Sequence, residues 1–311
     1  MIKERDTTVD YVRCVAIISI VCWHIMRCFF DKSINGALHF VQTYSVPLFF
    51  LLSGYVADLT RNRIVDNGFL HFLKRKTETL LVPFLVWSLL IYQFIDNPIP
   101  PLSTPIYFFT ELLAQPDMGA WFLMSLFCIQ IVCYPIVRYS KWYWWGALIL
   151  ILIGSQFLFQ SFFYNNIYHY ICFLAGIIIA RYRSFVITDI IATLSIIVFV
   201  VAEIMYPHPI LVTIPLGVAL LYASSFVNSE GMISKLALQI GQNSLAVYLI
   251  HFYFVWYFAE PFINVSGFRA PPVLFLVFVV SFVVSIICVY VSKIICCFPY
   301  LGYILFGKKL K

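Results

Sequence analysis

The chain has 311 residues, of which 62% are hydrophobic and only 11% are charged, and its mean hydropathy is +0.93. Soluble domains carry roughly a quarter charged residues, so this composition excludes a soluble globular protein. The net charge of +6 comes from 20 lysines and arginines against 14 aspartates and glutamates, and the basic residues follow the loops between apolar runs. We therefore exclude nucleic-acid binding and expect an all-α, polytopic membrane protein with a single domain over residues 1–311.

Apolar runs of about 20 residues can cross the hydrocarbon core of a bilayer as helices. Residues 273–284 are apolar on every face, whereas transmembrane β-strands alternate polar and apolar residues. The sequence thus predicts about ten transmembrane helices. Their approximate ranges are 9–30, 36–57, 79–95, 119–138, 143–160, 164–180, 185–205, 209–227, 240–258 and 272–295.

The basic residues are distributed unequally between the two sides of the predicted membrane. With a cytoplasmic N-terminus, sixteen lysines and arginines fall in the inner loops and tails, three fall outside, and Arg13 lies within a span. Cytoplasmic loops carry an excess of Lys and Arg. We therefore expect both termini to be cytoplasmic.

Two further features concern the loops and the cysteines. The outer connection 96–118 contains five prolines around an apolar stretch, and it is either a lid or re-entrant segment or a stiff loop. The nine cysteines show no metal-type spacing, so we interpret them as small, reduced core residues and expect no metal.

The first predicted span carries two ionisable residues, Arg13 and His24. Eleven residues at about 100° each make three turns plus about 20°, so both side chains share one helix face about 16 Å apart along the axis. Asp10 lies three residues before Arg13 and can pair with it. One interpretation is a structural Arg13–Asp10 pair and a satisfied core histidine. The other is a polar passage across the membrane, because ionisable groups in spans usually mark function.

Other candidate residues lie in the second, third and ninth spans. Ser53, Gly54 and Tyr55 lie at the predicted depth of Arg13, where small residues allow close approach of another helix or of a ligand. His251 lies in the outer half of the ninth span and can line one cavity with His24. The basic cluster Lys74, Arg75 and Lys76 is predicted to open the third helix at the cytoplasmic surface.

Together these segments resemble one family, the acyltransferase type 3 integral membrane proteins. In the first predicted helix, the resemblance is carried by Val9-Asp10-Tyr11-Val12-Arg13-Cys14-Val15-Ala16 followed by His24. In the second predicted helix, it is carried by residues 47–55. Weaker resemblances, in the same order as in the family, are residues 80–84, 121–123, 173–176 and 243–251.

The resemblance implies transfer of an acyl group, usually acetyl from cytoplasmic acetyl-CoA, to a hydroxyl of a carbohydrate or lipid-linked glycan. It implies a multi-pass enzyme in the inner or plasma membrane of a bacterium, acting on cell-envelope polysaccharide. His24 would be catalytic, and Arg13, Arg75 and Lys76 would bind the donor. We add two groups of candidates to these residues. Ser53 and Tyr55 are candidates for the donor site, and Trp121, Tyr248 and His251 for binding the acceptor or orienting His24.

One departure from the family pattern concerns the donor site. Many members carry two arginines three residues apart before the third-helix Leu-Leu-Pro step, and these positions are Lys76 and Thr79 here. Arg75 is adjacent and can replace one of them. Neutral imidazole can take the proton of an attacking hydroxyl. The sequence leaves open whether transfer is direct or passes through an acyl-histidine.

The competing function is transport, as a glycan exporter or small-solute carrier. Carriers typically place acidic residues and broken helices near the midplane of the membrane. Here Glu203 and Asp58 lie near the ends of predicted spans. A structural subunit without chemistry leaves the Arg13/His24 stripe unexplained, so the sequence favours acyl transfer.

Overall fold

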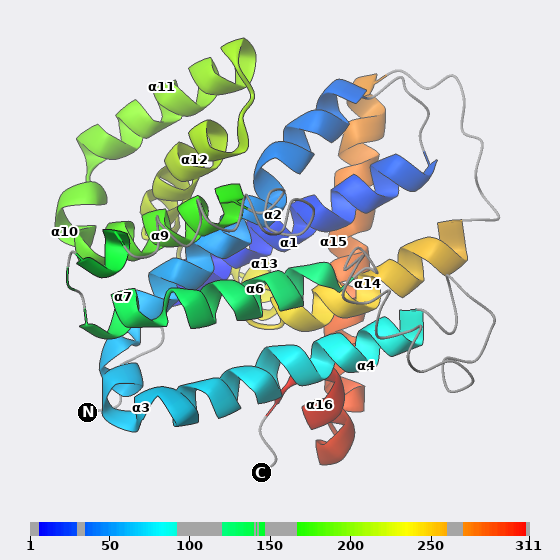
Figure 1. Ribbon diagram of the computed structural model, residues 1–311. Helices are drawn as coiled ribbons and strands as arrows, with labels where there is room; N and C mark the ends of the chain where they lie inside the picture. The colour runs from blue at the N-terminus through cyan, green and yellow to red at the C-terminus, as the bar shows by residue number, and fades with distance from the viewer. Residues whose placement is uncertain are drawn as a thin grey trace. The chain divides into compact units, whose positions relative to one another are not determined.

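The computed structural model describes residues 6–29, 35–91, 120–139, 141, 143–146, 167–259 and 270–308. Over these residues the regular elements are all helices (Figure 1), as the predicted all-α class requires. The chain forms two compact units. The first consists of Met1–Val56 and Ile171–Ile294, and the second of Ala57–Tyr170 and Ile295–Lys311. The expected single functional domain over 1–311 stays a prediction.

The first unit is built around α1 (Thr7–Phe29), which packs against three helices from the second half of the chain. These are α12 (Pro209–Ser224), α13 (Met232–Gln242) and α14 (Ser244–Ala259). The unit also contains most of α2 (Asn35–Leu59) and α9 (Ile167–Arg181), together with α10 (Arg183–Val186), α11 (Asp189–Met205) and α15 (Ala270–Ile295). Figure 1 shows α11 and α12 side by side, and they are extensively in contact.

The exposed fractions of the side chains distinguish the central helix of this unit from its peripheral helices. Val12, Ile17 and Val21 on α1 have no exposed surface, whereas Ile204 on α11 and Phe275 on α15 are more than 70% exposed. Exposed apolar side chains carry no penalty against lipid tails, which are equally apolar. Most of α1 therefore lies in the protein interior, with the Asp10 carboxylate buried, while α11 and α15 present apolar surface to hydrocarbon.

Within the described part of the chain, three helices are long and apolar enough to cross a membrane: Thr7–Cys28, Gly36–Leu59 and Val273–Ile295. Four shorter apolar helices are Trp121–Val132, Ile167–Arg181, Pro209–Ser224 and Ser244–Val255. All seven coincide with predicted spans. Of the fifth predicted span only residues 143–146 are described, and the connection 96–118 lies outside the described residues. The chain is thus a helical membrane protein, and the count of ten spans stays a prediction.

The second unit begins with a long helix that changes its geometry in the middle. α3 (Arg61–Lys76) runs into a π-helical turn, η2 (Thr77–Leu81), and continues as α4 (Val82–Ile91). α6 (Trp121–Val132), α7 (Tyr134–Tyr139) and α16 (Pro299–Phe306) complete the described part of the unit. Trp87 Nε1 on α4 donates a hydrogen bond of 2.8 Å to the Leu305 carbonyl, which fixes α16 on α4.

Two predicted helix boundaries differ from the structure. The basic cluster Lys74–Lys76 occupies the last turn of α3 and does not open a helix, because a helical stretch already precedes it after Gly68, the non-helical residue that divides α3. The predicted span 240–258 is divided at Asn243, between α13 and α14. The Asn243 backbone N–H and side-chain amide both donate to the Gln239 carbonyl, which ends α13 there.

Candidate functional site

The first-unit part of the candidate site begins with the ion pair at the start of α1. Arg13 Nη1 lies 3.6 Å from Asp10 Oδ1, which confirms the predicted pair. The Asp10 side chain is 1% exposed and that of Arg13 is 26% exposed. A buried carboxylate without a cationic partner is strongly destabilising, so Arg13 has a structural role whatever else it binds.

Close packing of α13 holds this part of α1 in place. A Cβ atom on Gly241 would overlap the Asp10 backbone carbonyl. Only glycine therefore allows α13 to approach the Asp10 backbone this closely. The backbone that carries the Asp10–Arg13 pair is thereby fixed by a contact with a helix from the other end of the chain.

Because α1 is one continuous helix, His24 lies on the Arg13 face, as the helical period predicts. Its ring meets that of His251 on α14, with the centroids 5.1 Å apart and the planes 60° apart. The rings of Trp23 and Phe252 meet His24 edge to face at 4.7 and 5.7 Å. The two histidines that the sequence placed at similar depth are thus in contact.

The hydrogen bonding of His251 determines which of its nitrogens is available. His251 is 1% exposed, and its Nδ1 lies 3.0 Å from the Val247 carbonyl oxygen. A carbonyl oxygen only accepts, so Nδ1 carries the proton and Nε2 of the neutral ring keeps its lone pair. Within the described residues Nε2 has no hydrogen-bond partner. The Tyr248 ring lies 6.0 Å from the His251 ring, on the same helix.

The second-helix motif is a site of close helix packing. A Cβ atom on Gly54 would overlap the Phe173 carbonyl oxygen on α9, and one on Gly176 would overlap the Leu51 carbonyl oxygen on α2. The two glycines therefore let α2 and α9 cross with their backbones in contact. Tyr55 is fully buried beside this crossing and Ser53 is half-buried. Packing thus explains Gly54, while Ser53 and Tyr55 stay predicted donor-site residues.

The other predicted residues belong to the second unit. Arg75 is exposed on the last turn of α3, and the Lys76 ammonium lies 5.5 Å from the centre of the Phe72 ring. The Thr79 hydroxyl, at the position where the family often has an arginine, donates to the Arg75 carbonyl at 2.8 Å. Thr79 therefore stabilises the backbone at the basic cluster and supplies no charge of its own.

Trp121 has a neighbour that the sequence analysis did not single out. The Trp121 ring, at the start of α6, lies 5.6 Å from the ring of His169 on α9. His169 is 1% exposed and also meets Tyr168, with ring centroids 4.0 Å apart. The sequence did contain a signal for this residue, because His169 is an ionisable residue inside a predicted span. His169 is therefore a further candidate beside Trp121 in the second unit.

The described side chains favour acid–base chemistry. They contain no group of three or more His, Cys, Asp or Glu side chains suited to hold a metal ion. Two imidazoles in contact can accept, hold and return one proton. Because the Val247 carbonyl accepts a hydrogen bond from His251 Nδ1, the Nε2 lone pair of His251 can accept a hydrogen bond from a reacting group or from a neighbouring side chain. Proton transfer to a positioned imidazole is the usual form of general-base catalysis.

A sequence model of the acyltransferase type 3 proteins, described as "Acyltransferase domain", matches residues 6–290. The match covers nearly the whole chain, including all the predicted site residues. Comparison with curated proteins and with solved structures gives no match.

Proposed function

This chain belongs to the acyltransferase type 3 family, and we propose that it is a membrane O-acetyltransferase. In this proposal it moves an acetyl group from cytoplasmic acetyl-CoA to a hydroxyl of a carbohydrate or lipid-linked glycan. The observation that carries the proposal is the ring contact between His24 and His251 on the α1 face that also bears Arg13. It provides two imidazoles in contact, of which His251 is buried, at one end of the face and a cationic group at the other.

His24 is the proposed general base. Its imidazole takes the proton of the acceptor hydroxyl as the oxygen attacks the thioester carbonyl of the donor. The tetrahedral intermediate then expels the CoA thiolate, which takes the proton back from the imidazolium of His24. The products are the O-acyl ester and free CoA, and no covalent enzyme intermediate is required. A general base of this kind contributes about 10²–10⁴ in rate.

His251 is the proposed orienting residue. With Nδ1 hydrogen bonded to Val247, its Nε2 can accept a hydrogen bond from the acceptor hydroxyl or from the His24 ring. That bond holds one partner in the geometry that proton transfer needs, since proximity and orientation account for much of enzymatic rate enhancement. Tyr248 and, in the second unit, Trp121 are the proposed acceptor contacts.

Donor binding is proposed for the cationic residues Arg13, Arg75 and Lys76, with Ser53 and Tyr55 along the path of the pantetheine arm. CoA carries several phosphate charges, and charge-assisted hydrogen bonds from Arg and Lys are the strong ones. The exposed end of α3, where Lys74 and Arg75 are adjacent, fits a polyanionic ligand. Arg13 lies partly exposed beside Asp10, so its side chain reaches the protein surface.

The proposed setting is the inner or plasma membrane of a bacterium, with the donor on the cytoplasmic side. The test is an assay of the purified protein in detergent with radiolabelled acetyl-CoA and a panel of glycans. We expect label in the glycan and an equal amount of released CoA. Release of CoA without labelled glycan, for every acceptor tried, would contradict acyl transfer to a carbohydrate.

A transport function would give a different result from acyl transfer when the purified protein is placed in sealed vesicles. In sealed vesicles, an exporter moves unmodified glycan across the membrane without any acetyl-CoA. A transferase produces an acetylated product whose formation depends on acetyl-CoA. Movement of unmodified glycan with no acetylated product would overturn the proposed function.

A further inference from the structure

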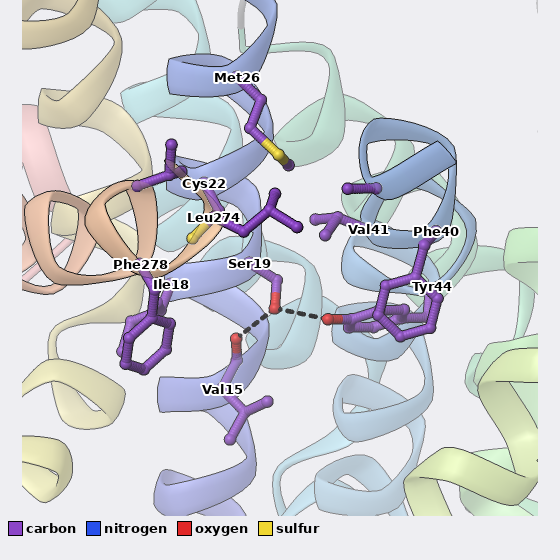
Figure 2. Close-up of a pocket in the computed structure, with 12 residues that line it drawn as sticks. Val15, Ile18, Ser19, Cys22, Met26, Phe40, Val41, Tyr44, Leu274 and Phe278 are labelled. Carbon is purple, nitrogen blue, oxygen red and sulfur yellow. Dashed lines mark hydrogen bonds between the residues drawn. The ribbon is translucent and has the colours of Figure 1, made fainter. Parts of the chain in front are cut away.

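A cavity of about 370 Å³ lies within the first unit between α1, α2 and α15. Figure 2 shows Ile18, Ser19, Cys22 and Met26 of α1 on one side of it. α2 contributes Ala37, Phe40, Val41 and Tyr44, and α15 contributes Leu274, Val277 and Phe278. Apart from Ser19, Tyr44, the Cys22 thiol and the Met26 thioether, every lining side chain is hydrocarbon. The family motifs described above do not account for this cavity.

The cavity lies on the side of α1 opposite the Arg13/His24 face. Cys22 is two residues before His24, which corresponds to about 200° around the helix axis. Ser19 and Met26 lie within about 60° of Cys22, on its side of α1, by the same spacing. An occupant of the cavity is therefore separated from His24 by the body of α1, and the acyl group being transferred cannot be that occupant.

The polar atoms of the cavity satisfy one another. The Ser19 hydroxyl donates to the Val15 carbonyl at 2.9 Å, so the hydrogen bond of 3.0 Å between Ser19 and Tyr44 is donated by the Tyr44 hydroxyl. Figure 2 shows this chain from Tyr44 through Ser19 to Val15. Buried hydroxyls that are already paired need no polar ligand. The cavity is therefore suited to an apolar occupant.

The surroundings of the cavity identify that occupant. Its three walls belong to helices that are each long and apolar enough to cross the membrane. Val15 and Phe278, at its edge, are 41% and 53% exposed, so the cavity opens toward the surface that these helices present to the bilayer. Apolar cavities do not hold water well, so hydrocarbon from the bilayer is the better occupant.

We propose that this cavity binds the hydrocarbon chain of a membrane phospholipid, which enters from the bilayer past Val15 and Phe278. The bound chain fills the space between α1 and its neighbours α2 and α15. Because α1 also carries Arg13 and His24 on its other face, the lipid chain supports the helix that positions both. This lipid site does not rest on the proposed acetyl transfer and is tested without an activity assay.

The test uses a phosphatidylcholine that carries a diazirine in one acyl chain. The purified full-length protein is reconstituted in phosphatidylcholine vesicles containing this probe, irradiated, and digested for mass spectrometry. Ile18, Cys22 and Met26 are only 6%, 7% and 2% exposed, so a bilayer lipid reaches them only from inside the cavity. We expect the probe to label these side chains as well as exposed residues of α15.

A matched pair of substitutions on α15 provides the control. Leu274 lines the cavity, whereas Leu276, two residues along, does not and is 57% exposed. Leu274→Trp fills the cavity and should abolish labelling of Cys22 and Met26, while Leu276→Trp should leave it unchanged. Both variants are checked by size-exclusion chromatography before reconstitution.

Two results would overturn the proposal. One is a native protein in which Leu276 and Phe275 are labelled but Ile18, Cys22 and Met26 are not; this result requires no variant and stands even if Leu274→Trp fails to fold. The other is labelling of the cavity by a diazirine-bearing acyl-CoA in competition with the phospholipid probe. That would assign the cavity to the donor's acyl chain.

Discussion

His24 and His251 meet ring to ring in the interior of the first unit, with their centroids 5.1 Å apart. They come from α1 and α14, which are distant in the sequence but packed against each other. The Val247 carbonyl holds His251 through Nδ1, so the two residues differ in freedom. His251 is fixed by its own helix, and no such bond to its own helix is present in the described contacts of His24. This difference supports the proposed roles of His24 as the base and His251 as the residue that orients it.

His24→Gln is expected to lower the rate of acyl transfer by about 10²–10⁴ while leaving CoA binding nearly unchanged. Glutamine keeps a similar volume and can hydrogen bond, but it cannot take up a proton near neutral pH. The rate is measured with labelled acetyl-CoA, and CoA affinity by isothermal titration calorimetry. The matched control is His39→Gln, because His39 is an exposed histidine on α2. Near wild-type transfer by a folded, CoA-binding His24→Gln protein would exclude His24 as the base.

His251→Phe is expected to have a smaller effect with a different kinetic signature. The substitution keeps a planar ring but removes Nε2, so it deletes one orienting hydrogen bond, with a net value of about 0.5–1.5 kcal/mol. We expect a roughly 2- to 12-fold loss in kcat/KM, with a rise in KM for the acceptor and an unchanged KM for the donor. A loss as large as that of His24→Gln would instead make His251 the base.

Local features of the fold could be predicted from the sequence. The α1 helix, its Arg13/His24 face and the Asp10–Arg13 pair all follow from a helical period acting over a few residues. The π turn at Thr77–Leu81 and the break at Asn243 were not predicted, although Pro83 follows the π turn and Gly241 precedes the break. A helix through Arg61–Lys76 was missed because its polar, charged sequence lacks the apolar run that marks a span.

Long-range contacts depended on the structure. Gly54 was equally compatible with packing and with ligand binding in the sequence, and only its contact with Phe173 decides for packing. His251 was paired with His24 on predicted depth alone, which does not determine which faces of the two helices meet. His169 was overlooked because it lies outside the motifs, and its contact with Trp121 joins separate helices.

Gly54→Ala and Gly176→Ala are each expected to destabilise the protein. The added methyl group overlaps a backbone carbonyl of the facing helix, which cannot move aside as a side chain can, so α2 and α9 must separate. Overpacking of this kind costs about 1–3 kcal/mol. The measurement is the midpoint of thermal unfolding in detergent. Gly36→Ala on α2 is the control, since nothing lies within 4 Å of its added Cβ, and an equal loss in all three variants would contradict the crossing.

The orientation of the chain is tested by cysteine labelling. Asn62 lies in a predicted cytoplasmic loop and Tyr206 in a predicted outer loop, and both are exposed. The background is Cys297→Ser, because Cys297 is an exposed cysteine. In this background a membrane-impermeant maleimide on intact cells should label Tyr206→Cys and spare Asn62→Cys. After permeabilisation both should react. The reverse pattern on intact cells would place the termini outside.

Arg75→Ala is expected to weaken CoA binding about 10- to 100-fold, because a hydrogen bond to a charged group contributes about 1.5–3 kcal/mol. The affinity is measured by calorimetry at two salt concentrations. Loss of a phosphate contact should reduce the dependence of affinity on salt as well as the affinity itself, since exposed charges are screened by ions.

The control for this experiment is Lys235→Ala, which removes an exposed positive charge on α13. It changes the net charge by the same amount as Arg75→Ala but lies outside the basic cluster at the end of α3. If both variants weaken CoA binding equally, the effect is one of overall charge. If neither does, Arg75 is not part of the donor site, and Arg13 and Lys76 remain as the proposed phosphate contacts. Arg13 is then tested as Arg13→Lys. Lysine keeps a cation beside the buried Asp10 carboxylate. It lacks the planar guanidinium, which can bind a phosphate through two N–H groups.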